Sequence, residues 1–275
     1  MVKKEKKKFL HDYFAKAGSI ESFGIVISGI IGAFLVKIFG ISIIWIAGGI
    51  SFFLTFFLLI FAKENFVKRN AKIKSPFKDL RNQSLTSVKY VRNHPVLFLF
   101  LIASAFVWLA GAFSGPLSWI SFLQQLDFPQ YAFGYMWSAM GIVGIFAPLI
   151  ALKFLKKGKE RQFMIICSIL TIISLAFIAF INTIVFALLI LLASIFFTGM
   201  SMPVERTYFH KFVKSKLRAT IGSVEGVLMG IIGVIGLPLA GLSADYLGAR
   251  YTILLSALLM IPSVIIYLRI NDRNT

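Results

Sequence analysis

Eight long apolar runs dominate this chain, and they constrain its fold more than any other feature. A helix needs about 20 apolar residues to cross the hydrocarbon core of a bilayer, and 58% of the 275 residues are hydrophobic. A spanning segment must satisfy its own backbone polar groups, which a helix does. The sequence therefore predicts an all-α integral membrane protein with eight transmembrane helices. We place these near Ser22–Phe39, Ile43–Ala62, Val96–Trp119, Tyr131–Leu152, Phe163–Ile181, Ile184–Met202, Ile221–Leu242 and Thr252–Ile270.

The basic residues orient these helices. If the N-terminus is cytoplasmic and the helices alternate in direction, all of the 29 Lys and Arg except Lys37 and Arg250 fall on the cytoplasmic side. This positive-inside pattern predicts a multi-pass protein of the plasma (inner) membrane with both termini in the cytoplasm. The net charge of +18 then reflects topology and contact with anionic lipid in the bilayer. Nucleic acid is not an expected partner.

The spacing of the runs divides the chain into four parts. Residues 1–21 form a basic cytoplasmic segment, 22–62 two helices, 63–94 a cytoplasmic linker and 95–275 a bundle of six helices. Apolar residues at helical spacing predict short amphipathic helices on the membrane surface within the first segment and the linker.

An internal repeat relates the two ends of the chain. The segment Ala15–Glu21 resembles Ala219–Glu225, and the likeness continues at the same offset through an in-register Gly-x-x-Gly. At a slightly larger offset, Phe39-Gly40 matches Leu247-Gly248. Such self-similarity is typical of transporters with duplicated halves.

Three of the predicted helices carry polar or aromatic stripes on one face. These stripes line a substrate cavity or form hydrogen bonds between packed helices, and both interpretations stay open. The cavity candidates are Ser104, Trp108, Tyr131, Tyr135, Ser138, Ser194, Thr198 and Ser201. Two stripes of small residues predict close helix packing instead, namely Gly24, Ser28 and Gly32 and, near the other end, Gly226, Gly230 and Gly233.

Ionisable groups are rare within the apolar runs. Glu21 and Glu225 lie at predicted helix entries and Asp245 near a helix end, where capping or gating is the expected role. Glu205 extends the Ser194 stripe. The single cysteine, Cys167, is predicted to be a buried, inert thiol. Because the sequence has no catalytic constellation and no clustered metal ligands, we expect neither an enzyme nor a metal site.

One segment resembles a known family. It comprises Pro203-Val204-Glu205-Arg206-Thr207-Tyr208, then Arg218-Ala219-Thr220, and finally Gly241 to Asp245 and Gly248. It is similar to helices ten to twelve of major facilitator superfamily transporters of the drug-efflux-like branch. The resemblance marks Glu205, Arg206 and Arg218 as candidates for gating or for helix entry. It also marks Gly158, in a loop that keeps the family's glycine and basic residues but has Leu155 in place of its acid.

The resemblance covers the chain as helices five to twelve of twelve. It therefore implies a partial fold, with two helices of the N-terminal bundle and a complete six-helix C-terminal bundle. The implied function is secondary active transport by alternating access, with efflux of an amphipathic compound driven by protons and no cofactor. Three alternatives stay open: uptake of a sugar or metabolite, a truncated product without independent transport, and a split transporter whose first four helices form a separate chain.

Overall fold

The computed structural model describes residues 22–61, 88–156, 158–213 and 218–270, without the side chains of residues 210 and 218–220. The described residues are almost entirely helical, and they contain no strand. Eight helical stretches are long and apolar enough to span a membrane, which confirms the predicted fold class and number. These stretches are Ser22–Phe39, Ile43–Ile60, Pro95–Gln125, Ala132–Phe154, Glu160–Phe180, Ile184–Phe209, Ile221–Leu247 and Ala249–Arg269.

The third span is two helices rather than one. Helix α4 covers Pro95–Phe113 and α5 covers Pro116–Gln125. Pro116 stands at the first position of α5, where its missing N–H costs nothing but where it cannot continue α4. The predicted single run Val96–Trp119 was therefore wrong in its interior, because its last four residues belong to the separate helix α5.

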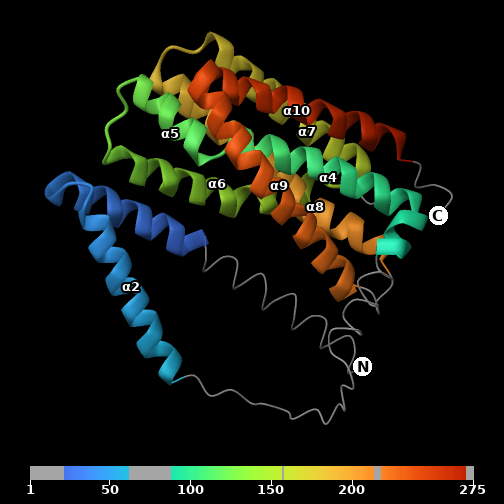
Figure 1. Cartoon of the computed structure of the whole chain (residues 1–275), viewed down its shortest axis with the longest axis horizontal. Helices are drawn as coiled ribbons and strands as arrows, with labels where there is room; N and C mark the ends of the chain where they lie inside the picture. Colours follow the sequence, from blue (N-terminus) through green and yellow to red (C-terminus); the bar gives the residue numbers. More distant parts are fainter. Residues whose placement is uncertain (1–21, 62–87, 157, 214–217, 271–275) are drawn as a thin grey trace.

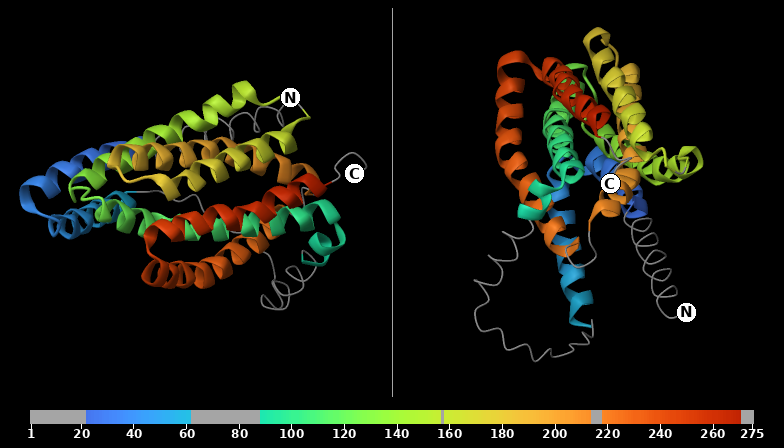
Figure 2. Two further views of the ribbon diagram at one scale, coloured as in Figure 1. Left: turned by 90° about the horizontal axis from the view of Figure 1, so that it is seen from above. Right: turned by 90° about the vertical axis from the view of Figure 1, so that its right-hand side faces the viewer.

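The remaining helices of the bundle follow in simple order. They are α6 (Ala132–Phe154), α7 (Glu160–Ala176) with the 3₁₀ turn η1 (Phe177–Phe180), α8 (Ile184–Phe212), α9 (Arg218–Leu247) and α10 (Ala249–Arg269). Most of them run roughly along one direction, as the view from above shows (Figure 2). Helix α10 packs on α4, α7 and α9, while α8 packs on α6 and α7.

Two apolar clusters hold the bundle together. In the first, the ring of Phe100 on α4 lies 5.4–6.0 Å from the rings of Tyr208, Phe209 and Tyr267. The second gathers side chains of α5, α6, α7, η1, α8 and α10, among them Phe122. The sole cysteine, Cys167, is buried in a smaller cluster with Ala147, Ala151 and Met200, as predicted.

The first two helices bury far less. The helix Ser22–Phe39 lies against α6, but α2 (Ile43–Ile60) has no buried residue and diverges from the bundle (Figure 1). Gly40 joins them with a φ of 78°, a left-handed conformation that suits glycine. The expected surface helix of the 63–94 linker lies mostly outside the described residues, although residues 88–93 are helical. The predicted helix within residues 1–21 lies wholly outside them.

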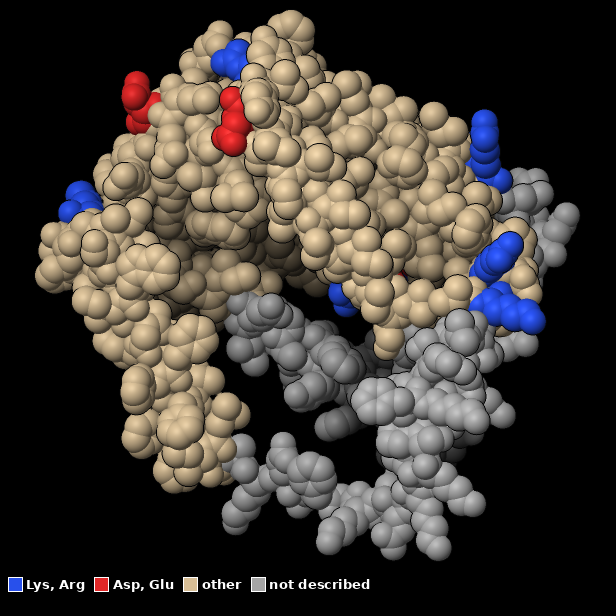
Figure 3. Space-filling view, viewed as in Figure 1, with Lys and Arg blue, Asp and Glu red and all other residues tan. Residues whose placement is uncertain are grey.

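Charged side chains are confined largely to the ends of the helices. In the space-filling view the belt between these ends is almost entirely uncharged (Figure 3). At one end, Lys211 Nζ lies 2.6 Å from Glu160 Oε1 and Arg161 donates to the carbonyl of Ile270. At the other, Arg250 donates to Asn182 Oδ1 at 2.7 Å. An apolar belt bounded by charged ends is what a bilayer requires.

Candidate substrate cavity

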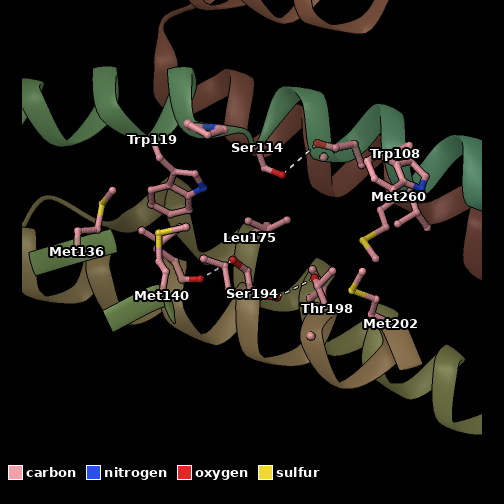
Figure 4. Close-up of a pocket in the computed structure, with 18 of the residues that line it drawn as sticks. Trp108, Ser114, Trp119, Met136, Met140, Leu175, Ser194, Thr198, Met202 and Met260 are labelled. Atoms are coloured by element: carbon pink, nitrogen blue, oxygen red, sulfur yellow. Dashed lines mark hydrogen bonds between the residues drawn. The ribbon is translucent and has the colours of Figure 1, made fainter. Parts of the chain in front are cut away.

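A cavity of about 460 Å³ lies inside the six-helix bundle. Its walls come from α4, α5, α6, α7, α8 and α10 (Figure 4). Trp119, Met136 and Met140 lie toward one end, and Trp108, Met202 and Met260 lie toward the other. Trp108 is 49% exposed and Met202 51% exposed, so the cavity is open on that side. Its volume is within the usual range for small-molecule sites, about 300–1,000 Å³.

The lining is mainly apolar, and aromatic and thioether side chains make up about half of its apolar residues. Three tryptophans and four methionines are among the lining residues, which are Val107, Trp108, Ala110, Gly111, Ser114, Pro116, Trp119, Met136, Trp137, Met140, Thr171, Leu175, Leu191, Ser194, Ile195, Thr198, Gly199, Met202, Glu205 and Met260. Tryptophan offers a large flat apolar face with one N–H donor. Methionine adapts to varied shapes. Such walls suit a ligand with extended apolar or aromatic surface.

The few hydroxyl groups of the lining already donate hydrogen bonds to backbone carbonyls. Ser114 donates to the carbonyl of Ala110, Ser194 to that of Leu191 and Thr198 to that of Ser194. Each hydroxyl oxygen keeps lone pairs that can accept a hydrogen bond. These groups therefore present acceptors, not donors, to a bound molecule.

Some of the cavity residues predicted from the sequence line the cavity, and others lie outside its lining. Trp108, Ser194 and Thr198 line the cavity. Ser104 is buried in α4 outside the lining, and Ser201 donates a hydrogen bond to Glu205 one turn away. The three candidates near the start of α6, which are Tyr131, Tyr135 and Ser138, lie outside the lining as well.

Ser138 belongs to a close crossing between α6 and the helix Ser22–Phe39. Its hydroxyl donates to the carbonyl of Val26 at 2.8 Å. A Cβ added to Gly29 would stand 2.3 Å from Ser138 Oγ, and one added to Gly134 would stand 2.4 Å from the carbonyl oxygen of Gly29. The Ser138 face therefore makes the hydrogen-bonded helix contact that was the alternative to a cavity. Near the same crossing, Lys37 Nζ lies 5.6 Å from the centroid of the Tyr131 ring.

The two glycine stripes expected to pack closely do not do so. A Cβ added at Gly24, Gly32, Gly226, Gly230 or Gly233 would meet no atom of the described residues within 4 Å. That prediction was wrong because spacing along a helix locates a small-residue face without saying which face meets a neighbour. The tight contacts use Gly29 and Gly134, and on α9 they use Gly236, whose added Cβ would lie 3.0 Å from Leu109 Cδ1.

The gating candidates lie in different settings. Glu205 lines the cavity and is partly buried, whereas Arg206 is exposed and interacts electrostatically with Glu225. Of the two roles expected for Glu225, capping was wrong, because α9 as described begins at Arg218 and has no acid in its first turn; gating stays a prediction. Asp245 is exposed in the last turn of α9, where the helix dipole does not favour an anion.

The remaining gating candidates are Glu21, Arg218 and Gly158. Glu21 and the side chain of Arg218 lie outside the described residues. Gly158 has a φ of 80° in the loop between α6 and α7, two residues before Glu160. A residue with a side chain would be strained there, so Gly158 allows the turn that brings Glu160 to Lys211.

Sequence reasoning missed most of the apolar lining. Trp119, Met136, Met140, Met202 and Met260 are spread over four helices of the bundle. In an apolar run such residues are typical of core packing, so no periodic signal separated them from their neighbours. Only the broken helix α4–α5 places Trp119 at the cavity.

Comparison with known proteins supports a transporter. The family model of the Major Facilitator Superfamily matches residues 11–224 and again residues 156–275. Together the two matches cover nearly the whole chain. A search of curated proteins gives no match. The eight membrane-spanning helices and the family match agree, and the chain belongs to the major facilitator superfamily of membrane transporters.

Proposed function

We propose that the chain exports a small amphipathic compound through the cavity of the six-helix bundle by alternating access, and that proton entry drives the export. The observation that carries this proposal is the composition of the cavity. Its walls are mostly apolar, with three tryptophans and four methionines, and only a few side chains offer hydrogen bonds (Figure 4). A ligand with a large apolar surface and a small polar part is complementary to such a lining.

The same composition disfavours a sugar. Sugar recognition requires many directed hydrogen bonds, because each buried hydroxyl left without a partner costs free energy. The polar side chains of the lining are Ser114, Thr171, Ser194, Thr198 and Glu205, and at least three of their hydroxyls already donate within their own helices. We therefore rank efflux of an amphipathic compound above uptake of a sugar or polar metabolite.

We further propose the plasma (inner) membrane as the location, with both termini in the cytoplasm. The distribution of Lys and Arg supports this orientation. In it, the open end of the cavity near Glu205 faces the cytoplasm. A compound could then enter the cavity from the cytoplasmic side, as export requires.

Reconstitution tests the proposal. The purified chain is placed in liposomes, a pH gradient is imposed, and movement of a panel of amphipathic fluorescent dyes is followed. We expect dye transport that stops when a protonophore collapses the gradient. We also expect Trp108→Ala to slow transport strongly, because the indole lines the cavity, while Trp45→Ala on exposed α2 leaves it unchanged.

Three results would count against the proposal. Transport that persists without a proton gradient removes the coupling. Equal rates for the wild type and Trp108→Ala remove the cavity as the path. Transport of sugars but not of dyes favours the alternative substrate class. Activity of the purified chain alone would also show that no separate chain is needed.

A further inference from the structure

A second pocket, the end pocket, lies where α7 begins and α8 ends. None of the described residues that line it also lines the substrate cavity. Its volume is about 380 Å³, and polar or charged side chains dominate its lining, among them Glu160, Arg161, Gln162, Tyr208 and Lys211. In the orientation proposed above, this end of the bundle faces the cytoplasm. The end pocket therefore differs from the substrate cavity in both place and chemistry.

Positive charge exceeds negative charge in the lining of the end pocket. Lys211 Nζ lies 2.6 Å from Glu160 Oε1, and an ammonium group has three N–H donors, so one bond to this carboxylate leaves it able to bind another anion. Arg161 adds a second cation, held in place by the hydrogen bond that it donates to the carbonyl of Ile270. Two cations thus lie against a single carboxylate.

The rim of the end pocket adds to its positive potential. Lys156 and Lys159 are exposed in the loop that joins α6 to α7, and Gly158 of the same loop lines the pocket. Helix α7 begins at Glu160, so the positive end of its dipole lies here as well. An anionic group that enters the end pocket is attracted by the lining, the loop and the helix end together.

The flank of α7 indicates that the anion comes from the bilayer. Gln162 lines the end pocket, and Ile166, Ile169 and Ile173 follow it at helical spacing along one face of α7. Gln162 is exposed, and the three isoleucines are 40–56% exposed. Within a membrane such an apolar face contacts acyl chains. A lipid whose chains lie along this face has its headgroup at the end pocket.

We propose that the end pocket binds the phosphate of an anionic phospholipid from the cytoplasmic leaflet, and that Lys211 and Arg161 recognise it. Basic pockets between membrane helices on the cytoplasmic side bind the headgroups of such lipids. Glu160 opposes the phosphate, and its pairing with Lys211 reduces that repulsion. The inference goes beyond the proposed function and takes only the orientation of the chain from it.

Native mass spectrometry of the purified chain in detergent tests the site. Two lipids with the same acyl chains are titrated, phosphatidylglycerol with a net negative charge and phosphatidylcholine with none. We expect the chain to bind phosphatidylglycerol at least about fivefold more tightly, the effect of one net cation near the membrane surface. Glycerol 3-phosphate carries a phosphate without acyl chains, and it should not displace the bound lipid.

Two variants that break the same ion pair should act in opposite directions. Lys211→Gln should weaken phosphatidylglycerol binding by about fivefold. Glu160→Gln should strengthen it, because the change removes the opposing carboxylate and leaves Lys211 to the phosphate. Unchanged binding of phosphatidylcholine shows that both variants are folded. The control Lys89→Gln removes an exposed cation outside the end pocket and should behave as wild type.

Each other result overturns the proposal in a distinct way. If the wild type binds the two lipids equally, the end pocket does not recognise the headgroup charge. If Lys211→Gln and Glu160→Gln both weaken binding, their ion pair supports the fold and not a lipid. If Lys89→Gln weakens it as much as Lys211→Gln, the lipid responds to the overall charge of the chain. If glycerol 3-phosphate displaces the lipid, the end pocket is a site for a soluble phosphate. None of these results bears on transport through the substrate cavity.

Discussion

The helix Ser22–Phe39 and helix α9 carry the same sequence phrase, yet they use it differently. Gly29 and Gly32 of the first correspond to Gly233 and Gly236 of the second. In the first helix Gly29 meets α6 and a Cβ at Gly32 would meet nothing described, whereas in α9 Gly236 meets α4 and Gly233 faces open space. A repeated motif therefore supplies two positions for close approach, and the neighbouring helix selects one of them.

The ends of the two helices are more alike. Each finishes at a glycine in the left-handed region, Gly40 with φ 78° and Gly248 with φ 87°. In each the glycine N–H donates to the carbonyl four residues earlier, at 2.9 Å to Val36 and 3.1 Å to Ala244. Local conformation is thus conserved between the repeats where packing is not. The reason is that a left-handed cap depends on the residue itself, whereas packing depends on what lies opposite.

The largest expected effect comes from enlarging the corresponding glycines Gly29 and Gly233. Gly29→Leu should force the first helix away from α6, because even a Cβ there would overlap Ser138 and Gly134; overpacking of this kind costs about 1–3 kcal/mol or more. Gly233→Leu, its counterpart on α9, should be tolerated. Disulfide cross-linking of Val26→Cys to Gly141→Cys, in a Cys167→Ala background, measures the separation.

The chosen cysteine pair suits this measurement. A Cβ built at Gly141 lies 3.0 Å from Val26 Cγ2, close enough for a disulfide to form in the unaltered helix crossing. The expected yield is high with Gly233→Leu and low with Gly29→Leu. Equal yields in the two variants would show that the crossing at Gly29 does not hold the first helix.

A smaller effect is expected at the two glycines that end these helices, Gly40 and Gly248. Gly40→Ala and Gly248→Ala should each destabilise by about 1–2 kcal/mol, the usual cost of a left-handed conformation for a residue with a Cβ. Space is not the cause, because an added Cβ would meet no described atom at either position. Thermal unfolding in detergent, followed by labelling of the buried Cys167, measures the Gly248 variant.

The Gly40→Ala variant needs a different measurement. Its effect should appear in how the first two helices resist proteolysis, since they lie outside the clusters that bury Cys167. A matched control, Gly24→Ala, places the same methyl group inside a helix with open space around it. If that control is as damaging as Gly40→Ala, the left-handed turn is not the source of the loss.

The smallest expected effect concerns one hydrogen bond. Ser138→Ala removes the bond from Ser138 to the carbonyl of Val26 and should cost about 0.6 kcal/mol, as such bonds between membrane helices do on average. Ser28→Ala removes a hydroxyl whose hydrogen bond, among the described residues, stays within its own helix and goes to Ile25. The change in cross-linking equilibrium should therefore be measurable for Ser138 and absent for Ser28.

The fold was largely predictable because its main determinant is local. A run of about 20 apolar residues must become a spanning helix whatever surrounds it, so all eight spans were located from composition and length. What failed were the boundaries of individual helices. Pro116 divides the third span, and α9 as described begins at Arg218, ahead of Glu225.

The cavity was predictable only where a polar residue made it visible. Trp108, Ser194 and Thr198 stood out against apolar neighbours, and all three line it. Ser138 stood out just as clearly but meets the first helix instead. Methionines such as Met140 and Met260 gave no signal, because the same side chain fills a core or lines a cavity according to whether a neighbouring atom is present.

By itself, then, the sequence determined that the chain spans a membrane and how many spans it has. These properties follow from the length and polarity of short segments. Only the tertiary structure decided which small-residue face of each helix is buried, which stripe lines the cavity and that Glu205 is its one carboxylate. Those properties are set by atoms from other helices, whose approach no single segment encodes.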